Sequence, residues 1–383
     1  MGKDLEKKYV VISGFNTNSI NRGNAALSYG AVTFLKENGL IEEGDEIIRF
    51  ETYTNPFKKS RALEEHVFID GVEWTYKAIP VFRIENFLLK RGIQLPWTNF
   101  SKILKHIKCE AADYGGDGLS DIYGDASFLA RMNQTFILWK FGIPLIMLPQ
   151  TIGPFRKQKN YDIALKVMRY ASKIYVRDDR FINTLDKENL AYERVKDLSA
   201  YMKPEPFDID IRPDSIGLNI SGLTYSNKYH GLENQFENYP ALIDAIIEYF
   251  IGKGKTVYLI PHSYNFSHPD PFNDDLEVCR EVYKKYQNKS VILIDKDLKS
   301  PQVKYVISKM SFFIGTRMHS NFAAIYTKVP VFGLAYSYKF KGGFDANGLD
   351  GERQTAVINN LKREDIENVI NKIESFYCTI ENK

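Results

Sequence analysis

Short apolar segments alternate with helical segments along most of this chain, and no other feature limits the fold as much. Apolar segments at 9–15, 45–50 and 144–151 are expected to be strands. Helices are expected at 24–39, 74–92 and 100–107. This order is typical of βαβ units, in which helices connect the strands of a mainly parallel sheet. The sequence therefore predicts an α/β protein whose strands end along common edges.

The alternation stops once and then starts again, which suggests two domains. The stretch YMKPEPFDIDIRPD (201–214) contains three prolines and four acidic residues and is interpreted as a linker. A chain of 383 residues is also too long for one core. We expect two doubly wound, Rossmann-like domains facing a cleft, over 1–200 and 215–383. The helix expected at 363–380 lacks a strand of its own, so packing back on the N-terminal domain stays open.

The composition excludes several classes of protein. Hydrophobic residues make up 44% and charged residues 26%, which is ordinary for a globular domain. No apolar run approaches the roughly 18 residues that span a bilayer, and the charged N-terminus does not resemble a secretory signal. The net charge of +3 does not favour nucleic-acid binding. Cys109, Cys279 and Cys378 are too far apart to suggest a metal site or a disulfide framework, so a cytoplasmic location is expected.

One strand–helix junction carries the strongest signal for a functional site. The apolar run FFIG ends at Gly315, and NFAAIY begins a helix soon after it, so Arg317 and His319 fall between them together with Met318 and Ser320. Ligands of open α/β sheets bind at such junctions, where the helix dipole and backbone N–H groups favour anions. Arginine offers a planar fork for carboxylate or phosphate, and histidine exchanges protons near neutral pH. A structural Arg–His pair is the alternative, and we favour the functional interpretation.

Other polar groups also follow expected strands. The turn GFNTNSINRGNAALS (14–28) could cradle a phosphate or hydroxyl groups, or could simply cap a helix. The loop DYGGDGLSDIYG (113–124) lets a ligand approach its backbone. Its Asp117 and Asp121 could orient sugar hydroxyls, act as a base or bind a divalent ion, and we favour a hydroxyl-binding or structural role. The remaining candidates at strand ends are Gln150 and Thr151, which a turn would also use, Arg177, for which a salt bridge is favoured, and His262.

In this order, the motifs resemble those of the polysaccharide pyruvyl transferase family. The matching elements are the turn at 14–27, YGGDGLSD, LPQTIGPF, VRDD, IPHS and GTRMHSNFAAIYTKVPVFGLAYSYK, spread from about residue 9 to 345. The resemblance implies a two-domain fold similar to GT-B glycosyltransferases. It also implies a transferase of surface polysaccharide (exopolysaccharide or capsule) biosynthesis. Its substrates would be phosphoenolpyruvate and a sugar acceptor, and its product a pyruvate ketal across two sugar hydroxyls.

The resemblance also implies roles for particular residues. His319 would be the general acid, Arg317 a second catalytic group, and the base would be Asp117, Asp121 or His262. The donor would be bound by Arg317, Met318, His319, Ser320, Arg177, Lys339 and His262. The acceptor, in the N-terminal domain, would be bound by Asn21, Gly23, Asn24, Gly116, Asp121, Gln150 and Thr151. No cofactor is expected, phosphoenolpyruvate being a co-substrate, and a dependence on divalent metal is left open.

Two other functions stay open. A GT-B glycosyltransferase would use a sugar nucleotide at the same cationic junction, and a non-catalytic relative would only bind sugar. The acceptor sugar is not readable, and a lipid-linked oligosaccharide would bring the protein to the inner face of the cytoplasmic membrane. The segment YKAIPVFRIENFLLKRGIQLPW (76–97) is then a candidate docking element, although we favour a buried helix.

Overall fold

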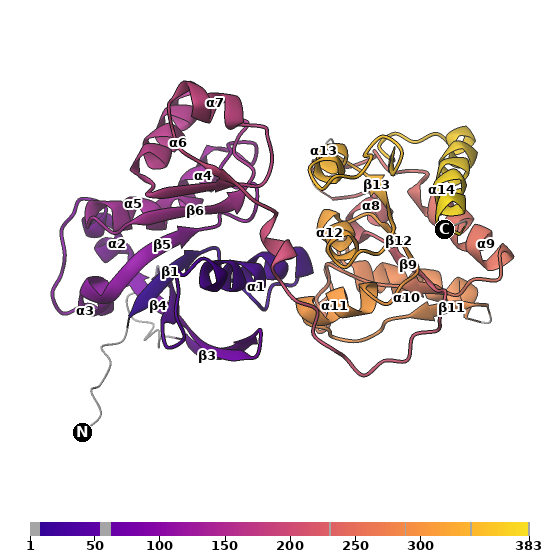
Figure 1. Ribbon diagram of the computed structural model, residues 1–383, viewed down its shortest axis with the longest axis horizontal. Helices are drawn as coiled ribbons and strands as arrows, with labels where there is room; N and C mark the ends of the chain where they lie inside the picture. Colours follow the sequence, from indigo (N-terminus) through magenta and orange to yellow (C-terminus); the bar gives the residue numbers. More distant parts are fainter. Residues whose placement is uncertain (1–7, 54–62, 230, 288, 338, 382–383) are drawn as a thin grey trace. The chain divides into compact units, whose positions relative to one another are not determined.

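The chain folds into two compact units (Figure 1). Unit 1 contains the residues up to Thr17 and Leu27–Tyr201, and unit 2 contains Asn18–Ala26 and the residues from Met202 onward. The sequence had placed 18–26 in the N-terminal domain, whereas the structure groups this segment with the C-terminal one. The computed structural model describes residues 8–53, 63–229, 231–287, 289–337 and 339–381.

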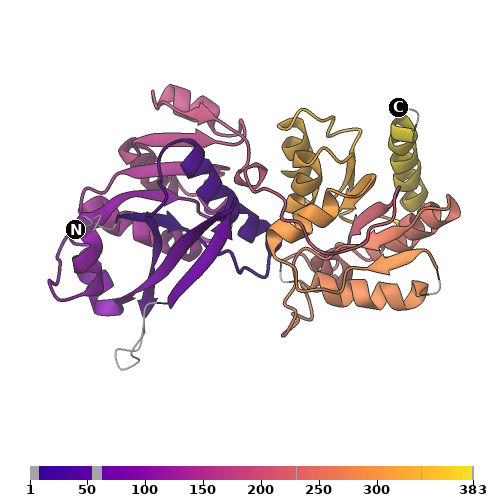
Figure 2. The same cartoon turned by 60° about the horizontal axis from the view of Figure 1, so that its bottom comes forward.

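Figure 2 shows the sheet of unit 1 in a second view. This sheet has eight strands, in the order β3-β4-β2-β1-β5-β6-β7-β8. All neighbouring strands are parallel except the hairpin pair β3 and β4. The strands are β1 (Tyr9–Ser13), β2 (Glu46–Tyr53), β3 (Leu63–Ile69), β4 (Val72–Phe82), β5 (Ile107–Ala112), β6 (Leu145–Gln150), β7 (Lys173–Val176) and β8 (Glu193–Arg194). The parallel core of the sheet agrees with the alternating pattern of the sequence.

The hairpin corrects one prediction. Residues 74–82 were expected to be helical, but they form most of β4, which lies between β2 and β3. The residues VEWTYKAIPVF are rich in the aromatic and β-branched residues that suit a strand. Pro80 cannot donate to the neighbouring chain, but β3 pairs with β4 only as far as Ala78. Pro80 therefore lies beyond the part of β4 that pairs with β3, where its missing N–H costs no hydrogen bond to β3.

Helices connect and cover the strands of unit 1. Phe100 of α3 and Leu89 of α2 enter one core cluster with Val11 and Ile48, and a second cluster joins β5, β6 and β7 to α4 and α6. The helices are α1 (Arg22–Glu37, whose first residues belong to unit 2), α2 (Arg83–Leu89), α3 (Asn99–Ile103), α4 (Asp125–Arg131), α5 (Asn133–Lys140), α6 (Gln158–Tyr170), α7 (Ile182–Lys187) and the 3₁₀ helices Leu104–His106 and Leu198–Ala200.

Unit 2 contains a six-stranded sheet in the order β11-β10-β9-β12-β13-β14, and all its strand pairs are parallel. The strands are β9 (Ile216–Asn219), β10 (Val257–Leu259), β11 (Val291–Leu293), β12 (Phe312–Gly315), β13 (Val331–Ala335) and β14 (Thr355–Val357). The helices are α8 (Gly222–Ser226), α9 (Tyr239–Gly252), α10 (Asp275–Tyr286), α11 (Ser300–Ile307), α12 (Met318–Tyr326), α13 (Lys339–Asp345), α14 (Ile366–Glu381) and the 3₁₀ helix Arg363–Asp365.

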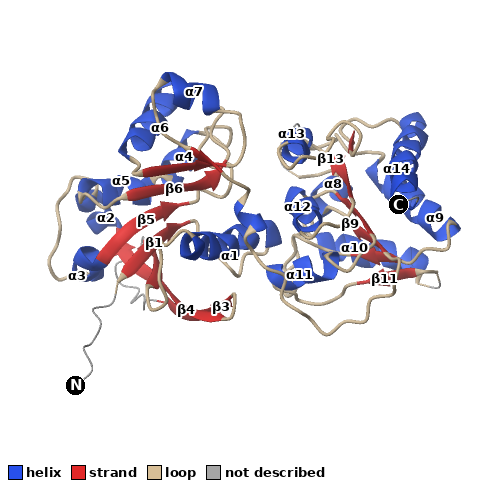
Figure 3. Cartoon of the chain, in the orientation of Figure 1, coloured by secondary structure: helices blue, strands red, loops and turns tan. Residues whose placement is uncertain are grey.

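Both faces of the unit 2 sheet are covered by helices (Figure 3). Along β12, Phe312 and Ile314 enter one core cluster and Phe313 enters the other, as the alternation of a strand requires. The C-terminal helix α14 packs on α9 of the same unit through Val369, Ile373 and Tyr377, among other residues. Unit 2 is therefore doubly wound, as predicted. Among the described residues, no helix has both the length and the apolar character that a bilayer crossing requires.

Candidate active site

The junction between β12 and α12 is formed as the sequence predicts. Arg317 stands in extended conformation as the residue before α12, directly after β12 and Thr316. The hydroxyl of Ser320 donates to the carbonyl of Arg317 (2.7 Å) and to Oδ1 of Asn219 (3.2 Å), so Ser320 stabilises the first turn of the helix. The backbone N–H of Arg317 donates to the same Asn219 oxygen (2.9 Å). The side chain of Asn219, at the end of β9, therefore fixes the start of α12.

A buried carboxylate ties several strand ends together at this junction. Asp275, the first residue of α10, is fully buried. Its Oδ1 accepts from the N–H of Gly222 (2.9 Å), and its Oδ2 accepts from the N–H groups of His262 (3.1 Å) and Ser263 (2.9 Å). It also accepts from Nη2 of Arg317 at 2.7 Å. The loops after β9, β10 and β12 therefore converge on one negative charge.

Arg317 is less available than a free arginine would be. Its Nε and Nη2 donate to Asp275, and Nη2 also donates to Oδ1 of Asn273 (2.7 Å). Among the described residues, Nη1 makes no hydrogen bond, so the guanidinium can offer this group to a ligand. Burial alone would lower the pKa of Arg317, but Asp275 outweighs this effect and the pKa is raised, so the group stays charged. The guanidinium that was predicted to bind an anion thus uses most of its donors within the protein.

His262 and His319 lie near this arginine. His262 is almost fully buried, and its Nδ1 has no hydrogen-bond partner in the described part of the chain. Burial, followed by the charges of His319, Arg317 and Arg22, lowers the pKa of His262 well below its usual value. His262 is therefore neutral at physiological pH. His319 is half-buried and packs edge-on against Phe322, with ring centroids 5.6 Å apart.

The segment Asn18–Ala26 is built into the same site. Its Asn21 pairs with Ser263 in an antiparallel bridge, and the N–H of Arg22 donates to the carbonyl of His262 (3.0 Å). A Cβ atom added to Gly23 would lie 2.7 Å from Nδ1 of His319. Any residue other than glycine would therefore displace the imidazole ring of His319. Asn21 and Gly23 were predicted to face the acceptor in the N-terminal domain, but the structure places them beside the predicted donor residues.

The side chain of Arg22 anchors this segment. Its Nε donates to the carbonyl of Leu298 (2.7 Å), its Nη2 pairs with Asp297 (2.9 Å), and its guanidinium lies over the ring of Tyr264 at 4.3 Å. Arg22 is therefore a positioning residue that the sequence analysis missed. The neighbouring Asn24, which was predicted to bind the acceptor, is exposed.

Two further predicted donor residues belong to the same unit. Met318 is the half-buried first residue of α12, and its sulphur lies near Gly343 of α13. Lys339 begins α13, but its side chain lies outside the described part of the chain. Its role stays a prediction.

A second group of predicted residues lies at the carboxyl ends of the unit 1 strands. The carboxylate of Asp113, after β5, accepts from the N–H groups of Gly115 (3.0 Å) and Gly116 (2.9 Å) and so shapes the glycine loop. Burial raises the pKa of Asp113 to about 6. The carbonyl of Gly116 in turn accepts from the N–H of Thr151 (2.8 Å) after β6. The loop is thereby held next to the end of β6.

Arg177, after β7, is bound to neighbours of its own unit. Its Nε donates to the hydroxyl of Thr151 (3.1 Å), and its Nη1 pairs with the buried Asp197. The hydroxyl of Thr151 donates to Asp178. The salt bridge favoured from the sequence is thus present. The predicted role of Arg177 in donor binding stays a prediction.

Gln150, Asp121 and Asp117 each have separate partners within the protein. Gln150 is buried, and its amide donates to the carbonyl of Ala112 (3.0 Å). Asp121 accepts from the N–H groups of Arg156 and Lys157, just before α6, and from the side chain of Asn160 within it. Although burial acts in the opposite direction, these bonds hold the pKa of Asp121 below its usual value. Asp117 is half-buried and accepts from the hydroxyl of Tyr123 (2.9 Å).

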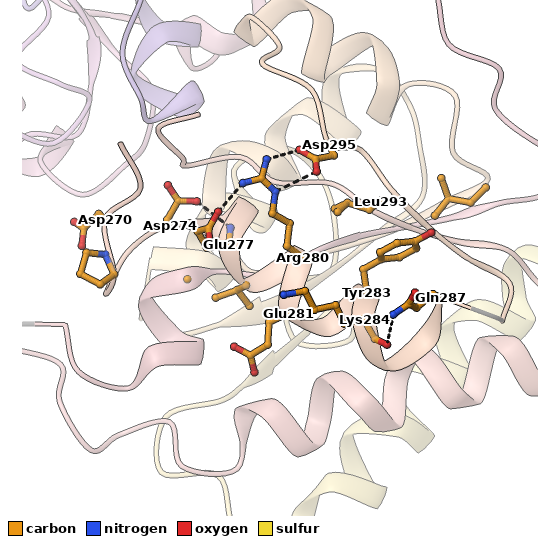
Figure 4. A pocket seen from close by; sticks show the side chains of 14 residues that line it. Asp270, Asp274, Glu277, Arg280, Glu281, Tyr283, Lys284, Gln287, Leu293 and Asp295 are labelled. Carbon is orange, nitrogen blue, oxygen red and sulfur yellow. Dashed lines mark hydrogen bonds and ion pairs between the residues drawn. The ribbon is translucent and has the colours of Figure 1, made fainter. Parts of the chain in front are cut away.

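A pocket of about 920 Å³ lies along α10, and its described lining includes none of the predicted site residues. Figure 4 shows Arg280 bonded to both Asp295 and Glu277. Five carboxylates and only two cations line the pocket, so it does not suit an anionic substrate. The carboxylates are those of Asp270, Asp274, Glu277, Glu281 and Asp295, and the cations are Arg280 and Lys284.

Comparison with known proteins identifies the family. The family model described as polysaccharide pyruvyl transferase matches residues 21–338, most of the chain. The chain belongs to the polysaccharide pyruvyl transferase family. The match includes the Asn21 segment, the glycine loop and the Arg317–His319 junction, so the resemblance seen in the motifs is confirmed. A pyruvyl transferase that acts on polysaccharide implies a sugar acceptor. No protein with a curated description matches the chain.

Solved structures support the fold. The UDP-GlcNAc 2-epimerase from Methanocaldococcus jannaschii is 12% identical, with a TM-score of 0.53 over 96% of this chain and 92% of that one. The Neisseria meningitidis UDP-GlcNAc 2-epimerase bound to UDP-GlcNAc is 10% identical, with a TM-score of 0.49 over 98% and 93%. A Burkholderia vietnamiensis α,α-trehalose-phosphate synthase (UDP-forming) is 8% identical, with a TM-score of 0.42 over 100% and 96%. The likeness to the first structure confirms the predicted GT-B-like α/β fold.

In this pyruvyl transferase family member, the sequence analysis missed Asp275 and Asn219. Asp275 follows another aspartate in NDDLEV, a pattern that locally indicates only a helix cap, and Asp274 does cap α10 by accepting from the N–H groups of Leu276 and Glu277. No local pattern distinguishes the aspartate that caps the helix from the one that pairs with Arg317.

Proposed function

We propose that this chain transfers the pyruvyl group of phosphoenolpyruvate to two hydroxyls of a sugar in a surface polysaccharide, forming a ketal and releasing phosphate. The observation that carries the proposal is the junction in unit 2. There, Arg317 presents Nη1, α12 presents its amino terminus, and His319 is the second residue of the same helix. Phosphoenolpyruvate bears a phosphate and a carboxylate, and this junction favours anions.

The proposed reaction uses His319 as the general acid. His319 gives a proton to the methylene carbon C3, and C2 becomes electrophilic. One sugar hydroxyl attacks C2, the bond between C2 and the bridging oxygen breaks, and phosphate leaves. The second hydroxyl then attacks C2 and closes the ketal. Of the two hydroxyl protons, one restores His319 and the other leaves with phosphate, so atoms and charges balance.

The contacts narrow the choice of base. The carboxylate of Asp121 accepts from the N–H groups of Arg156 and Lys157, just before α6, which makes it unsuitable for accepting protons from substrate. His262 is neutral and its Nδ1 can accept a proton, although its low pKa makes it a weak base. Asp117 remains the carboxylate candidate. The fixed charge of Arg317 and the dipole of α12 would stabilise the departing phosphate.

The test measures phosphate released from phosphoenolpyruvate with a panel of galactose-, mannose- and glucosamine-based acceptors. We expect acceptor-dependent release that His319→Ala reduces by about 100-fold or more, as for loss of a general acid. The matched control is His268→Ala, because His268 is exposed in a loop. Arg317→Lys keeps a charge beside Asp275 but removes Nη1, and it should weaken donor binding without unfolding the protein. Binding of a sugar nucleotide but not of phosphoenolpyruvate would overturn the proposal.

A further inference from the structure

A group of large apolar side chains is exposed on and just after α2 in unit 1. Ile84 is 75% exposed, Phe87 54%, Ile93 49% and Trp97 71%. Single exposed apolar residues are ordinary, but a close group of them on a folded protein marks an interaction surface. The sequence analysis favoured a buried helix here, and the structure instead exposes one face of it.

The packing of α2 fixes which face is exposed. Leu89 is fully buried in the core, and the buried Glu85 accepts from the N–H of Phe82 (3.3 Å), which caps the helix. Asn86 and Asn133 exchange amide hydrogen bonds, one of them at 2.9 Å, and so attach α2 to α5. Figure 1 shows α2, α3 and α5 grouped beside β5. Because residues i and i+3 share a helix face, Ile84 and Phe87 both point away from this packing.

The same face is basic. Arg83, Lys90 and Arg91 are exposed, and the guanidinium of Arg91 lies 3.5 Å from the ring centroid of Phe87. Between residues 83 and 97 the sequence contains three Lys and Arg residues, and its one acidic residue is the buried Glu85. We call Arg83, Ile84, Phe87, Lys90, Arg91, Ile93 and Trp97 the α2 patch.

The charge of the α2 patch decides between possible occupants. In a symmetric dimer formed through this face, the patch would meet its own copy and bring like charges together. Cores of protein interfaces are also depleted in lysine. An anionic lipid surface suits both the apolar and the basic side chains of the patch. The apolar side chains enter the boundary between headgroups and acyl chains, while Lys and Arg stay at the phosphates. Tryptophan is also enriched at that depth.

We propose that the α2 patch docks unit 1 on an anionic lipid surface. The bound part of the chain is the exposed face of α2 with Ile93 and Trp97, and its ligand is a bilayer rich in acidic phospholipid. Because the α2 patch contains none of the residues assigned to the reaction proposed above, the lipid proposal does not depend on that reaction, and its test requires no turnover.

The experiment is co-sedimentation of the full chain with vesicles of phosphatidylcholine alone or mixed with phosphatidylglycerol. We expect binding to the mixed vesicles only, falling as salt rises. The variant Arg83→Gln/Lys90→Gln/Arg91→Gln should bind about 100-fold more weakly, from the contribution of each cation near such a surface. Ile84→Ser/Phe87→Ser/Trp97→Ser should also lose binding. The control is Phe272→Ser/Val357→Ser, which changes exposed apolar residues of unit 2.

Trp97 supplies a direct signal. Brominated acyl chains should quench the tryptophan fluorescence of the wild type, and Trp97→Phe should remove that quenching, since Trp74 is buried and Trp139 stacks on Tyr170. Circular dichroism should show each variant folded. Failure of the wild type to bind anionic vesicles, or equal loss in the control, would overturn the proposal. So would light scattering that shows a dimer dissociated by the serine variant, because a second copy would then occupy the patch.

Discussion

Replacing Asp275 by asparagine tests whether the buried carboxylate holds the unit 2 site together. The substitution keeps the size of the side chain but removes its charge. It leaves the guanidinium of Arg317, whose side chain is only 10% exposed, without its ionic partner. The new amide group can also accept with only one oxygen. Its NH₂ group must therefore face donors. These are either the backbone N–H groups of His262 and Ser263, or the N–H of Gly222 together with the guanidinium of Arg317.

The expected loss is large. Breaking a buried ion pair by removing one partner costs about 3–5 kcal/mol, and each buried donor left without an acceptor costs about 1–3 kcal/mol. Because Arg317 keeps a small contact with solvent and a bond to Asn273, we take the lower end, about 3 kcal/mol in the free energy of unfolding. A loss of that size is a substantial fraction of the roughly 5–15 kcal/mol that stabilises a typical domain.

Urea unfolding provides the assay. All three tryptophans (Trp74, Trp97 and Trp139) lie in unit 1, so their fluorescence follows that unit, whereas circular dichroism follows both. Asp275→Asn should shift the dichroism transition more than the fluorescence transition. Asp270→Asn is the control, because among the described residues the side chain of this exposed aspartate accepts one local bond, from the N–H of Phe272. Its effect should stay within about 0.5 kcal/mol.

A double-mutant cycle separates the ion pair from the hydrogen bonds. Combining Asp275→Asn with Arg317→Met removes both charges, so the double variant should be more stable than the sum of the two single losses predicts. A loss below about 1 kcal/mol for Asp275→Asn, or strict additivity in the cycle, would refute the reasoning from a buried pair.

Three other predictions concern the glycine loop of unit 1, the buried Glu110 of the same unit, and Gly23 beside His319. Gly116 has a φ of +79°, and a Cβ atom added there would lie 3.0 Å from the half-buried guanidinium of Arg177, whereas Gly115, at +84°, has open space around it. Gly116→Ala should therefore destabilise the protein more than Gly115→Ala, for which only the backbone strain of about 1–2 kcal/mol applies. Thermal unfolding compares them, and equal losses would show that the close contact is unimportant. Burial raises the pKa of Glu110 to about 7, so the folded state binds a proton that the unfolded state has already released. Stability should fall by about 3 kcal/mol as the pH rises from about 4.5 to 7, and Glu110→Gln should remove most of this fall in urea titrations. An unchanged pH slope would contradict this assignment. Gly23→Ala should displace His319 and lower kcat with little effect on unfolding, and full activity would show that the ring position is not critical.

Part of this structure follows from local patterns in the sequence and part does not. The junction at Arg317 and His319 was predictable because a strand end and a helix start are both local signals. The strand at 74–82 was mistaken for a helix because its conformation is set by pairing with β2 and β3. The role of Asp275 arises only when loops that follow three strands meet, which no short window of sequence displays.

The candidate site shows the same division. The sequence placed several polar residues at strand ends, where the structure has them, but it could not show which of them bond to other groups of the protein. Asp121 accepts from backbone groups just before α6 and Gln150 donates to backbone carbonyls, whereas His262 keeps Nδ1 without a partner among the described residues. The grouping of Asn21 with His262 was also hidden, because the two segments are far apart in the chain.

The placement of residues 18–26 has a consequence for synthesis of the protein. This segment is made before its partners, which include Ser263, Asp297 and Ser300. Until the ribosome has added those residues, the first turn of α1 lacks these partners, although unit 1 ends earlier, at Tyr201. Unit 2 can be completed only after that early segment returns to it. Expressing residues 202–383 alone would therefore yield a unit that lacks part of its own site.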